Sequence, residues 1–164
     1  MASQRKKSIK KVYLILHNIR SVHNVGSIFR TADAVGVSKV FLTGYTPLPL
    51  DRFGKPRKDI AKTALGAQAS VPWEGVKGVD RLIKKLKKER VQTVALEQHP
   101  KALDYKSFKV KDKVAILLGN EVRGTSSQTL SKVDSIIEIP MKGEKESLNV
   151  SVACGIALFR LLDG

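Results

Sequence analysis

Residues 114–124 read VAILLGNEVRG, an apolar run followed by a short loop that begins and ends with a glycine. Five consecutive apolar residues without alternation are typical of a parallel strand that is covered on both faces. In open α/β sheets, ligands bind just beyond the carboxyl ends of such strands. Glu121 in this loop could be a simple turn or cap residue, but a glycine-flanked carboxylate at that edge favours a functional role. The segment therefore predicts a buried strand that leads directly into a binding loop.

Similar β-rich runs lie on both sides of this segment and alternate with helical patterns. The expected strands are 12–16, 40–43, 91–96, 114–118 and 135–139. The expected helices, from apolar residues at a 3.6-residue period, are 25–35, 59–65, 79–89, 126–133 and 149–162. Asn24 is a plausible N-cap of the first helix, and Ser147 and Asn149 are each explicable as caps of the last. Strand–helix alternation predicts an α/β fold with a mainly parallel sheet flanked by helices.

Length and composition predict one folded domain. The chain has 164 residues and is 42% hydrophobic, and we expect a basic N-terminal tail over 1–11 and a single domain over 12–164. One cysteine excludes a disulfide framework, and Cys154 is most simply a core residue. No apolar run has the ~20 residues that a membrane helix needs, and no secretory signal is recognisable. We therefore expect a cytoplasmic protein that contacts no membrane.

The charge is strongly positive and clustered. Thirty Lys and Arg against fifteen Asp and Glu give a net charge of +15, concentrated in 1–11, 52–62, 77–90 and 101–113. The lysines of 77–90, taken alone, indicate only the solvated face of a helix. The four clusters together favour a nucleic-acid surface, because each phosphate contact gains affinity by counterion release. Aromatic residues make up only 5%, which favours backbone recognition over base stacking.

Two other kinds of site are not supported. The three histidines do not fall at metal-ligand spacings, so no metal is expected. The loop 119–124 resembles the beginning of a P-loop, but Thr125 and Ser126 follow it where a P-loop has a lysine and then Ser or Thr.

Two further segments carry polar residues at expected strand–helix junctions. The first, NVGSIFR over 24–30, ends in Arg30, which by periodicity lies opposite the apolar stripe of its helix. Its neighbours on that face are small (Ser27, Thr31 and Ala34), which permits close approach by RNA or by a second subunit. The second segment is IPMKGEKESLN over 139–149, the end of a strand, a polar loop and the start of a helix.

Together the three segments resemble the three motifs of the SpoU/TrmH-type RNA ribose 2′-O-methyltransferases of the SPOUT superfamily. The first matches as N-x-G-x-x-x-R followed by TAD (24–33), and the second as L-G-N-E-x-x-G (118–124). The third matches as I-P-M-x-G followed by SLNVSVA (139–153). Each motif alone is weak, but three in order over residues 12–162 are highly specific.

This resemblance implies a SPOUT fold with a C-terminal deep trefoil knot, one of the rare exceptions to the rule against knots. It also implies methyl transfer from S-adenosyl-L-methionine to a ribose 2′-hydroxyl of tRNA or rRNA, in a homodimer whose sites span the subunit interface. A catalytically silent RNA-binding module of the same fold is the main alternative, and methylation of a base is a further one.

The resemblance also assigns roles to residues. Arg30 would act on the target hydroxyl, and because arginine is effectively always protonated, we favour an electrostatic role with an RNA phosphate as proton acceptor. The residues that would orient it, the cofactor and the ribose are Asn24, Glu121, Ser147 and Asn149. The expected cofactor-binding residues are Leu96, Glu97, Leu118, Gly119, Asn120, Ile139, Met141, Ser147 and Leu148. The expected RNA-binding residues are Arg5, Lys6, Lys7, Arg20, Arg52, Lys55, Arg57, Lys58 and Arg123.

Overall fold

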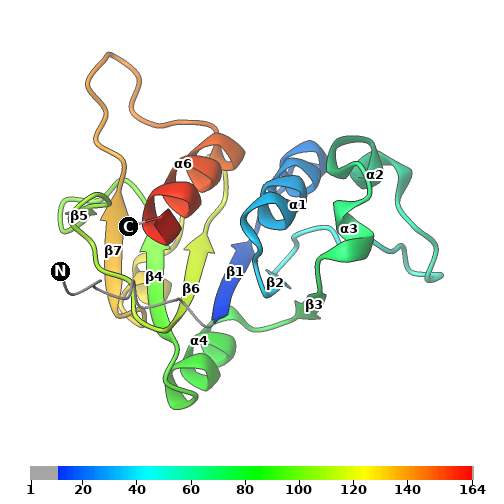
Figure 1. The fold of residues 1–164 in the computed structure, drawn as a ribbon, viewed down its shortest axis with the longest axis horizontal. Coiled ribbons are helices and arrows are strands. Elements are labelled where there is room, and N and C mark those ends of the chain that lie inside the picture. The colour runs from blue at the N-terminus through cyan, green and yellow to red at the C-terminus, as the bar shows by residue number, and fades with distance from the viewer. Residues whose placement is uncertain (1–10, 164) are drawn as a thin grey trace, which may run out of the picture.

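Figure 1 shows the computed structural model, which describes residues 11–163. Its centre is a seven-stranded sheet in the order β3-β2-β1-β6-β4-β7-β5, in which every strand pair is parallel. The strands are β1 (Lys11–His17), β2 (Lys39–Thr43), β3 (Trp73–Val76), β4 (Gln92–Leu96), β5 (Leu103–Asp104), β6 (Lys113–Leu118) and β7 (Ser135–Glu138). The helices are α1 (Val22–Val35), α2 (Lys58–Ala64), α3 (Ala67–Ser70), α4 (Val79–Lys88), α5 (Ser127–Leu130) and α6 (Val150–Asp163).

Helices cover both faces of the sheet, as the apolar run 114–118 predicts. One face packs against α1, α2, α3 and α6, and it receives Ile116 and Leu118 of β6. The other face packs against α4 and α5, and it receives Ala115 and Leu117 of the same strand. Because successive side chains of a strand point to opposite faces, a strand buried on both sides must be apolar throughout. The expected α/β fold with a parallel sheet flanked by helices is therefore confirmed.

The five expected strands are all present, and each end of a strand differs from the prediction by no more than one residue. The sequence prediction missed β3, β5 and the four-residue helix α3. The two missed strands are the two edges of the sheet, where one side of the strand is open and fewer side chains are buried. An edge strand needs no continuous apolar run, so neither showed a recognisable hydrophobic pattern.

The start of α1 corrects one prediction. Ser21 is the N-cap and its side chain accepts a hydrogen bond from the backbone N–H of Asn24, so the helix begins three residues earlier than expected. Asn24 lies in the first helical turn with only 6% of its surface exposed. The prediction that Asn24 is the N-cap is wrong, because its side chain bonds to two distant segments of the chain instead.

Asn149 caps α6, whereas the sequence allowed either Ser147 or Asn149 in this role. Its side-chain Oδ1 accepts from the backbone N–H of Ser151 at 2.9 Å, and its carbonyl accepts from Ala153. At α5, Ser126 is the cap, directly after Thr125, and the helix ends at Leu130 and not at the expected Val133. Lys11, expected in the tail, is the first residue of β1.

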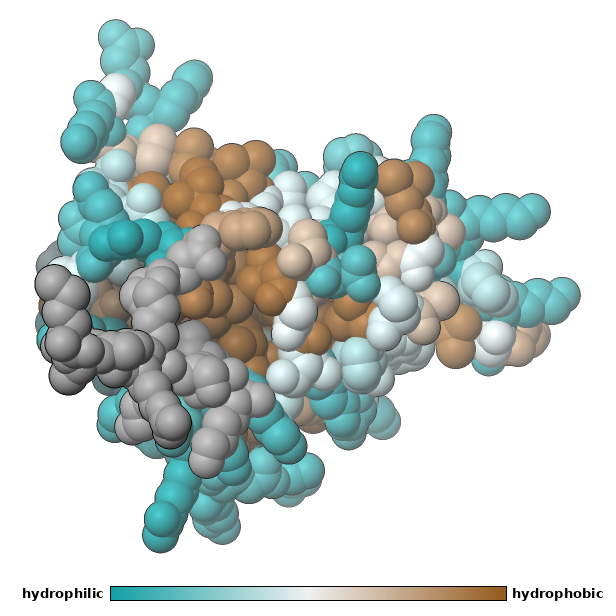
Figure 2. All heavy atoms as spheres, in the orientation of Figure 1, coloured by the Kyte–Doolittle hydropathy of each residue, from teal (hydrophilic) through white to brown (hydrophobic). Residues whose placement is uncertain are grey.

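One face of α6 leaves large apolar side chains uncovered. Val152, Ile156 and Phe159 are 49%, 38% and 49% exposed, and their spacing of four and three residues places them on one side of the helix. In Figure 2, drawn in the same orientation as Figure 1, a hydrophobic area lies where α6 runs. Among residues 11–163 no helix has the length and apolar character needed to cross a membrane.

Candidate functional site

The carboxyl ends of the central strands surround a cavity of about 490 Å³. Three neighbouring loops, which follow β4, β6 and β7, meet there with the first turns of α1 and α6. Parallel strands place their carboxyl ends at one edge, so these loops converge although they are far apart in the sequence. The lining residues are Asn24, Leu96, Glu97, Gln98, Leu118, Gly119, Asn120, Glu121, Val122, Arg123, Gly124, Glu138, Ile139, Glu146, Ser147, Leu148, Asn149, Val150 and Ala153.

Glu121 ties the loop after β6 to the start of α1. Its Oε1 accepts from the backbone N–H of Ser21 at 3.0 Å and from Asn24 Nδ2 at 3.2 Å, and its Oε2 accepts from the backbone N–H of Arg20 at 3.0 Å. Burial by itself would raise the pKa of Glu121. The three donors outweigh that effect and hold its pKa below the ordinary value, so the carboxylate is the favoured form.

Asn24 extends this contact to the third segment. Its Nδ2 donates to Glu121, and its Oδ1 accepts from Asn149 Nδ2 at 3.2 Å. The three side chains come from the beginning of α1, the loop after β6 and the cap of α6. A continuous polar chain therefore joins all three motif segments at one wall of the cavity.

Two glycines allow the loop after β6 to fold tightly against the loop after β4. A Cβ at Gly119 would overlap the Thr125 side chain and the Gly124 backbone, and Gly124 has a φ of +65°, in the left-handed region. The turn brings the backbone N–H of Thr125 within 2.9 Å of Glu97 Oε2. Burial raises the pKa of Glu97, and the Thr125 hydrogen bond opposes this only in part.

Asn120 connects the cavity to the segment that follows β2. Its Nδ2 donates to the carbonyl of Asn18 at 2.9 Å and contacts Tyr45 Oη at 3.0 Å. Asn18 Oδ1 in turn accepts from the backbone N–H of Tyr45 at 3.1 Å. The sequence did not single out Tyr45, because a lone tyrosine in a loop carries no motif.

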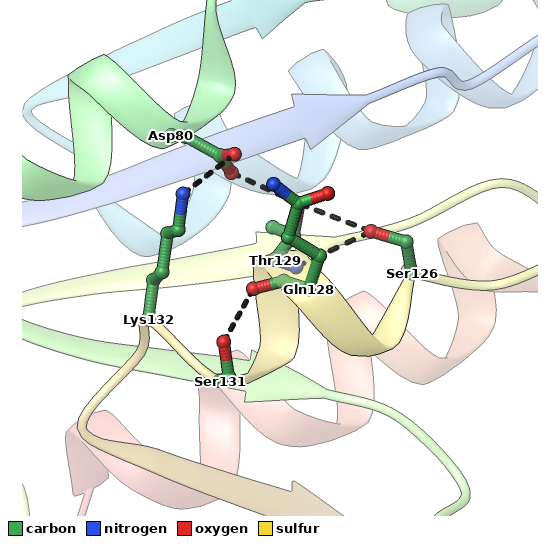
Figure 3. A network of polar contacts seen from close by, with 6 residues as sticks. All are labelled: Asp80, Ser126, Gln128, Thr129, Ser131 and Lys132. Carbon is green, nitrogen blue, oxygen red and sulfur yellow. Dashed lines mark hydrogen bonds and ion pairs between the residues drawn. The ribbon is translucent and has the colours of Figure 1, made fainter.

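A separate polar network supports the loop that follows β6. It lies on the face of the sheet that α4 and α5 cover (Figure 3). Asp80 of α4 accepts from Thr129 Oγ1 at 3.0 Å and pairs with Lys132 Nζ at 2.9 Å. Ser126, which follows the cavity loop directly, accepts from the backbone N–H of Thr129. The Lys132 hydrogen bond outweighs the desolvation of Asp80 and lowers its pKa. The network anchors α5 to α4 and so fixes the distal end of the cavity loop.

Most of the predicted site residues lie at the cavity. The predicted cofactor-binding residues that line it are Leu96, Glu97, Leu118, Gly119, Asn120, Ile139, Ser147 and Leu148. The predicted catalytic residues that line it are Asn24, Glu121, Ser147 and Asn149. Met141 and Arg30 do not belong to the lining. Arg30 is exposed on α1, and its side chain forms neither a hydrogen bond nor an ion pair within residues 11–163.

The predicted RNA-binding residues are dispersed. Arg123 lines the cavity, and Arg20, Arg52, Lys55 and Lys58 are exposed at other places. Arg57 donates to both carboxylate oxygens of Asp59, at 3.1 and 2.7 Å, so much of its hydrogen-bonding capacity is used within the chain. Arg5, Lys6 and Lys7 lie outside the described residues.

Two lining residues, Gln98 and Glu138, lie outside the motif segments that the sequence analysis marked. Five more lie inside the motif segments but were not named individually as site residues: Val122, Gly124, Glu146, Val150 and Ala153. Gln98 and Glu138 lie at or just beyond the ends of β4 and β7, so the rule that places ligands at carboxyl strand ends could have found them. Gln98 Nε2 also donates to the carbonyl of Ile139 at 2.8 Å, which joins two of the cavity loops.

In the described part of the chain, no three His, Cys, Asp or Glu side chains cluster as metal ligands would. Cys154 is buried in the core as expected, and burial raises the pKa of its thiol to about 12. A thiol with such a pKa stays protonated and has a structural role.

These features define an open, parallel α/β protein with a ligand cavity at the carboxyl edge of its sheet. A sequence profile of the SpoU rRNA Methylase family matches residues 11–159. The protein belongs to that family.

Similar proteins are enzymes that modify RNA. The 23S rRNA (guanosine-2′-O-)-methyltransferase RlmB of Xanthomonas axonopodis pv. citri is 34% identical over 150 residues, which cover 92% of this chain and 57% of the relative. RlmB of Escherichia coli K12 is 36% identical over 146 residues, which cover 89% of this chain and 57% of the relative. The chain thus spans about three fifths of the length of these relatives.

Solved structures agree with the fold. The A. aeolicus TrmH/SpoU tRNA modifying enzyme superposes with a TM-score of 0.82 at 27% identity, over 96% of this chain and 76% of the other. The AdoMet-bound rRNA methyltransferase from Sinorhizobium meliloti superposes with a TM-score of 0.81 at 27% identity, over 94% of this chain and 57% of the other.

Proposed function

We propose that this protein transfers a methyl group from S-adenosyl-L-methionine to a ribose 2′-hydroxyl of tRNA or rRNA. The observation that carries the proposal is the Glu121–Asn24–Asn149 chain, which joins the three family motifs at one cavity. The names of the relatives, which are RNA 2′-O-methyltransferases, support both the reaction type and the substrate class. The net charge of +15 supports a polyanionic substrate.

The cavity suits S-adenosylmethionine by size and charge. A volume of about 490 Å³ falls within the range of small-molecule sites. Four glutamates and one arginine line it, which favours a ligand with positive charge; they are Glu97, Glu121, Glu138, Glu146 and Arg123. The backbone groups of 96–97, 118–119 and 139–148 would hold the adenosine part. When bound, the cofactor supplies a methyl group on a positively charged sulfur, which is electrophilic without a metal.

The remaining difficulty is the nucleophile, because a ribose hydroxyl is weak until its proton is removed or polarised. We assign this task to Arg30. A guanidinium keeps its proton, so Arg30 would stabilise the negative charge that develops on the hydroxyl oxygen while an RNA phosphate accepts the proton. Glu121 and Asn24 would keep the start of α1 in the required position.

Because Arg30 lies outside the cavity of its own chain, the proposal includes a homodimer in which Arg30 serves the partner's cavity. The uncovered apolar stripe of α6 supports this arrangement. Val152, Ile156 and Phe159 would be buried between two subunits, and α6 packs on α1, the helix that carries Arg30. The C-terminal knot, a single domain over 12–164 and a cytoplasmic location also remain part of the proposal.

Replacing Phe159 with glutamate is expected to produce monomers. A charge introduced into the middle of an apolar interface is buried without a partner, so the dimer dissociation constant should rise about 100-fold or more. Sedimentation velocity of the wild type and the variant measures this change. Leu103→Glu is the matched control, because Leu103 is 51% exposed on the edge strand β5 and does not belong to the apolar stripe of α6. Equal oligomeric states of Phe159→Glu and wild type would contradict the proposed interface.

The reaction itself is tested in two steps. Calorimetric titration of the folded protein with S-adenosylmethionine should give a saturable heat with one site per chain. Incubation with RNA and methyl-labelled cofactor should then place label in nucleotides that resist alkaline cleavage, because a 2′-O-methyl group blocks that reaction. Label in alkali-sensitive nucleotides would indicate a base methyltransferase. RNA binding without cofactor binding would favour the silent RNA-binding module.

A further inference from the structure

Phe53 is an unusual feature of the segment between β2 and α2. The side chain is 73% exposed, the largest exposure of any aromatic residue among 11–163. Arg52 lies next to it, with its guanidinium carbon 4.8 Å from the centre of the ring. Figure 1 shows that this segment runs out to the side of the molecule, away from α6. An apolar ring in water is unfavourable, so its position at a projecting tip calls for a physical reason.

The tip is held in shape by its own hydrogen bonds. Asp51 Oδ1 accepts from the backbone N–H groups of Phe53 at 2.8 Å and Lys55 at 2.9 Å, and the Asp51 N–H donates to the Lys55 carbonyl at 2.8 Å. Gly54, with a φ of +76°, makes the reversal possible. A turn closed in this way keeps the ring of Phe53 outside, so its exposure is built into the local fold.

Positive charge is concentrated in the segment that carries the ring. Arg52, Lys55 and Lys58 are all exposed, while the carboxylate of Asp51 bonds to the turn and that of Asp59 bonds to Arg57. The surface at the tip therefore offers an aromatic face together with cations. Aromatic faces beside cationic side chains are the combination that binds unpaired nucleotides.

The same segment begins at the cavity. Tyr45, 58% exposed, contacts Asn120 through its hydroxyl, and Asn120 lines the cavity. RNA whose target ribose occupies the cavity can thus continue along residues 45–53 toward the tip. The loop that carries Phe53 therefore begins beside the cavity, at Tyr45.

We propose that Phe53 and Arg52 form a binding site for an unpaired base of the substrate RNA. The proposal rests on the proposed function and narrows its substrate class to RNA with an unpaired stretch beside the modified nucleotide. A base inside a continuous duplex is already stacked on both faces and has none free for the ring. The low aromatic content of the whole chain predicted recognition of the RNA backbone alone. Phe53 would add a contact with a base.

The test measures RNA affinity by fluorescence anisotropy with two probes, a short single-stranded oligoadenylate and a blunt RNA duplex of equal length. Phe53→Ala should weaken binding of the single strand about tenfold, because a base stacked on an aromatic ring contributes that much or more. Binding of the duplex should stay within about twofold of wild type, since its bases are not available. Leu103→Ala, which removes an exposed apolar side chain on β5, is the matched control and should change neither affinity.

Two further variants identify the kind of contact. Phe53→Trp should restore the single-strand affinity and Phe53→Leu should not, because leucine is apolar but has no aromatic face. Phe53→Ala should leave the slope of log affinity against log salt unchanged, while Arg52→Gln should reduce it, because only the arginine neutralises phosphate. Restoration by leucine, or an equal loss with both probes, would overturn the base-binding site. A change of oligomeric state in Phe53→Ala would also overturn it, by assigning the ring to a protein interface.

Cofactor binding separates this inference from the proposed function. Calorimetry should show the same S-adenosylmethionine affinity for Phe53→Ala and wild type, because the ring lies outside the cavity lining. If the wild type methylates RNA and Phe53→Ala binds the single strand normally, the base-binding site is wrong and the function stands. If the wild type does not bind S-adenosylmethionine, but Phe53→Ala binds the single-stranded RNA more weakly than the wild type does, the proposed function is wrong and the base-binding site stands.

Discussion

Replacing Arg30 with alanine is expected to reduce methyl transfer to RNA by about 100- to 1,000-fold, the usual effect of removing one group that stabilises a developing oxyanion. S-Adenosylmethionine affinity should be unchanged, because Arg30 is assigned to the ribose hydroxyl of the RNA and not to the cofactor. Single-turnover assays give the rate, and calorimetry gives the affinity. Arg30→Lys, which keeps the charge but not the planar guanidinium, should recover only part of the rate.

Mixed dimers test whether Arg30 acts on the partner's cavity. Ser147 is exposed and lines the cavity, so Ser147→Trp should block cofactor binding while leaving the fold intact. Each variant alone should be inactive. A mixture of equal amounts of Arg30→Ala and Ser147→Trp should recover about a quarter of wild-type activity, because half of the dimers are mixed and each mixed dimer has one intact site. No recovery in dimers shown to exchange subunits would mean that Arg30 acts within its own chain.

Replacing Glu121 with glutamine is expected to lower the free energy of unfolding by roughly 2–4 kcal/mol, because two backbone N–H groups and one side-chain amide lose a charged acceptor. Glutamine keeps one acceptor oxygen, so its NH2 group would face at least one of these N–H donors. Cofactor affinity should fall as well, since the contact that holds Asn24 at the cavity wall is weakened. Chemical denaturation and calorimetry measure the two effects. Glu89→Gln is the control, because Glu89 is exposed at the end of α4, does not line the cavity, and its side chain forms no hydrogen bond within residues 11–163.

The stability difference between wild type and Glu121→Gln should depend on pH. Folding lowers the pKa of Glu121 below its ordinary value of 4.5, so the carboxylate is the form that the folded state favours. Its contribution is fully present above pH 4.5 and is lost as the pH falls through the lower pKa of the folded state. The two denaturation curves should therefore converge in acid. A difference that stays constant into the acidic range would show that the charge of Glu121 is not what stabilises this contact.

Much of the fold was predictable because its information is local. The run 114–118 is apolar throughout since both faces of β6 are covered. Helical periodicity located α1, α2, α4, α5 and α6 to within three residues at each end. β3 and β5 could not be predicted in this way, because edge strands bury too little surface to require a pattern. Asn24 was misassigned as a cap for a related reason. Its partners, Glu121 and Asn149, are 97 and 125 residues away in the sequence.

The residues of the candidate site also fall into two groups, those that a local motif marks and those that only the fold brings to the cavity. The glycines and polar residues of 118–124 and 139–149 marked two walls of the cavity, because loops after buried parallel strands reach one edge. Gln98, Tyr45 and Glu138 carried no motif, and only their positions in space connect them with the site.

The amino-acid sequence by itself determined the order of the five inner strands and of every helix except α3, the three motif segments and the positive charge of the protein. The tertiary structure alone decided that Arg30 does not line the cavity of its own chain and that Phe53 stands exposed on a hydrogen-bonded turn. Periodicity and motifs report on neighbours within a few residues. The direction in which a side chain points depends on the packing of distant segments, which no local pattern records.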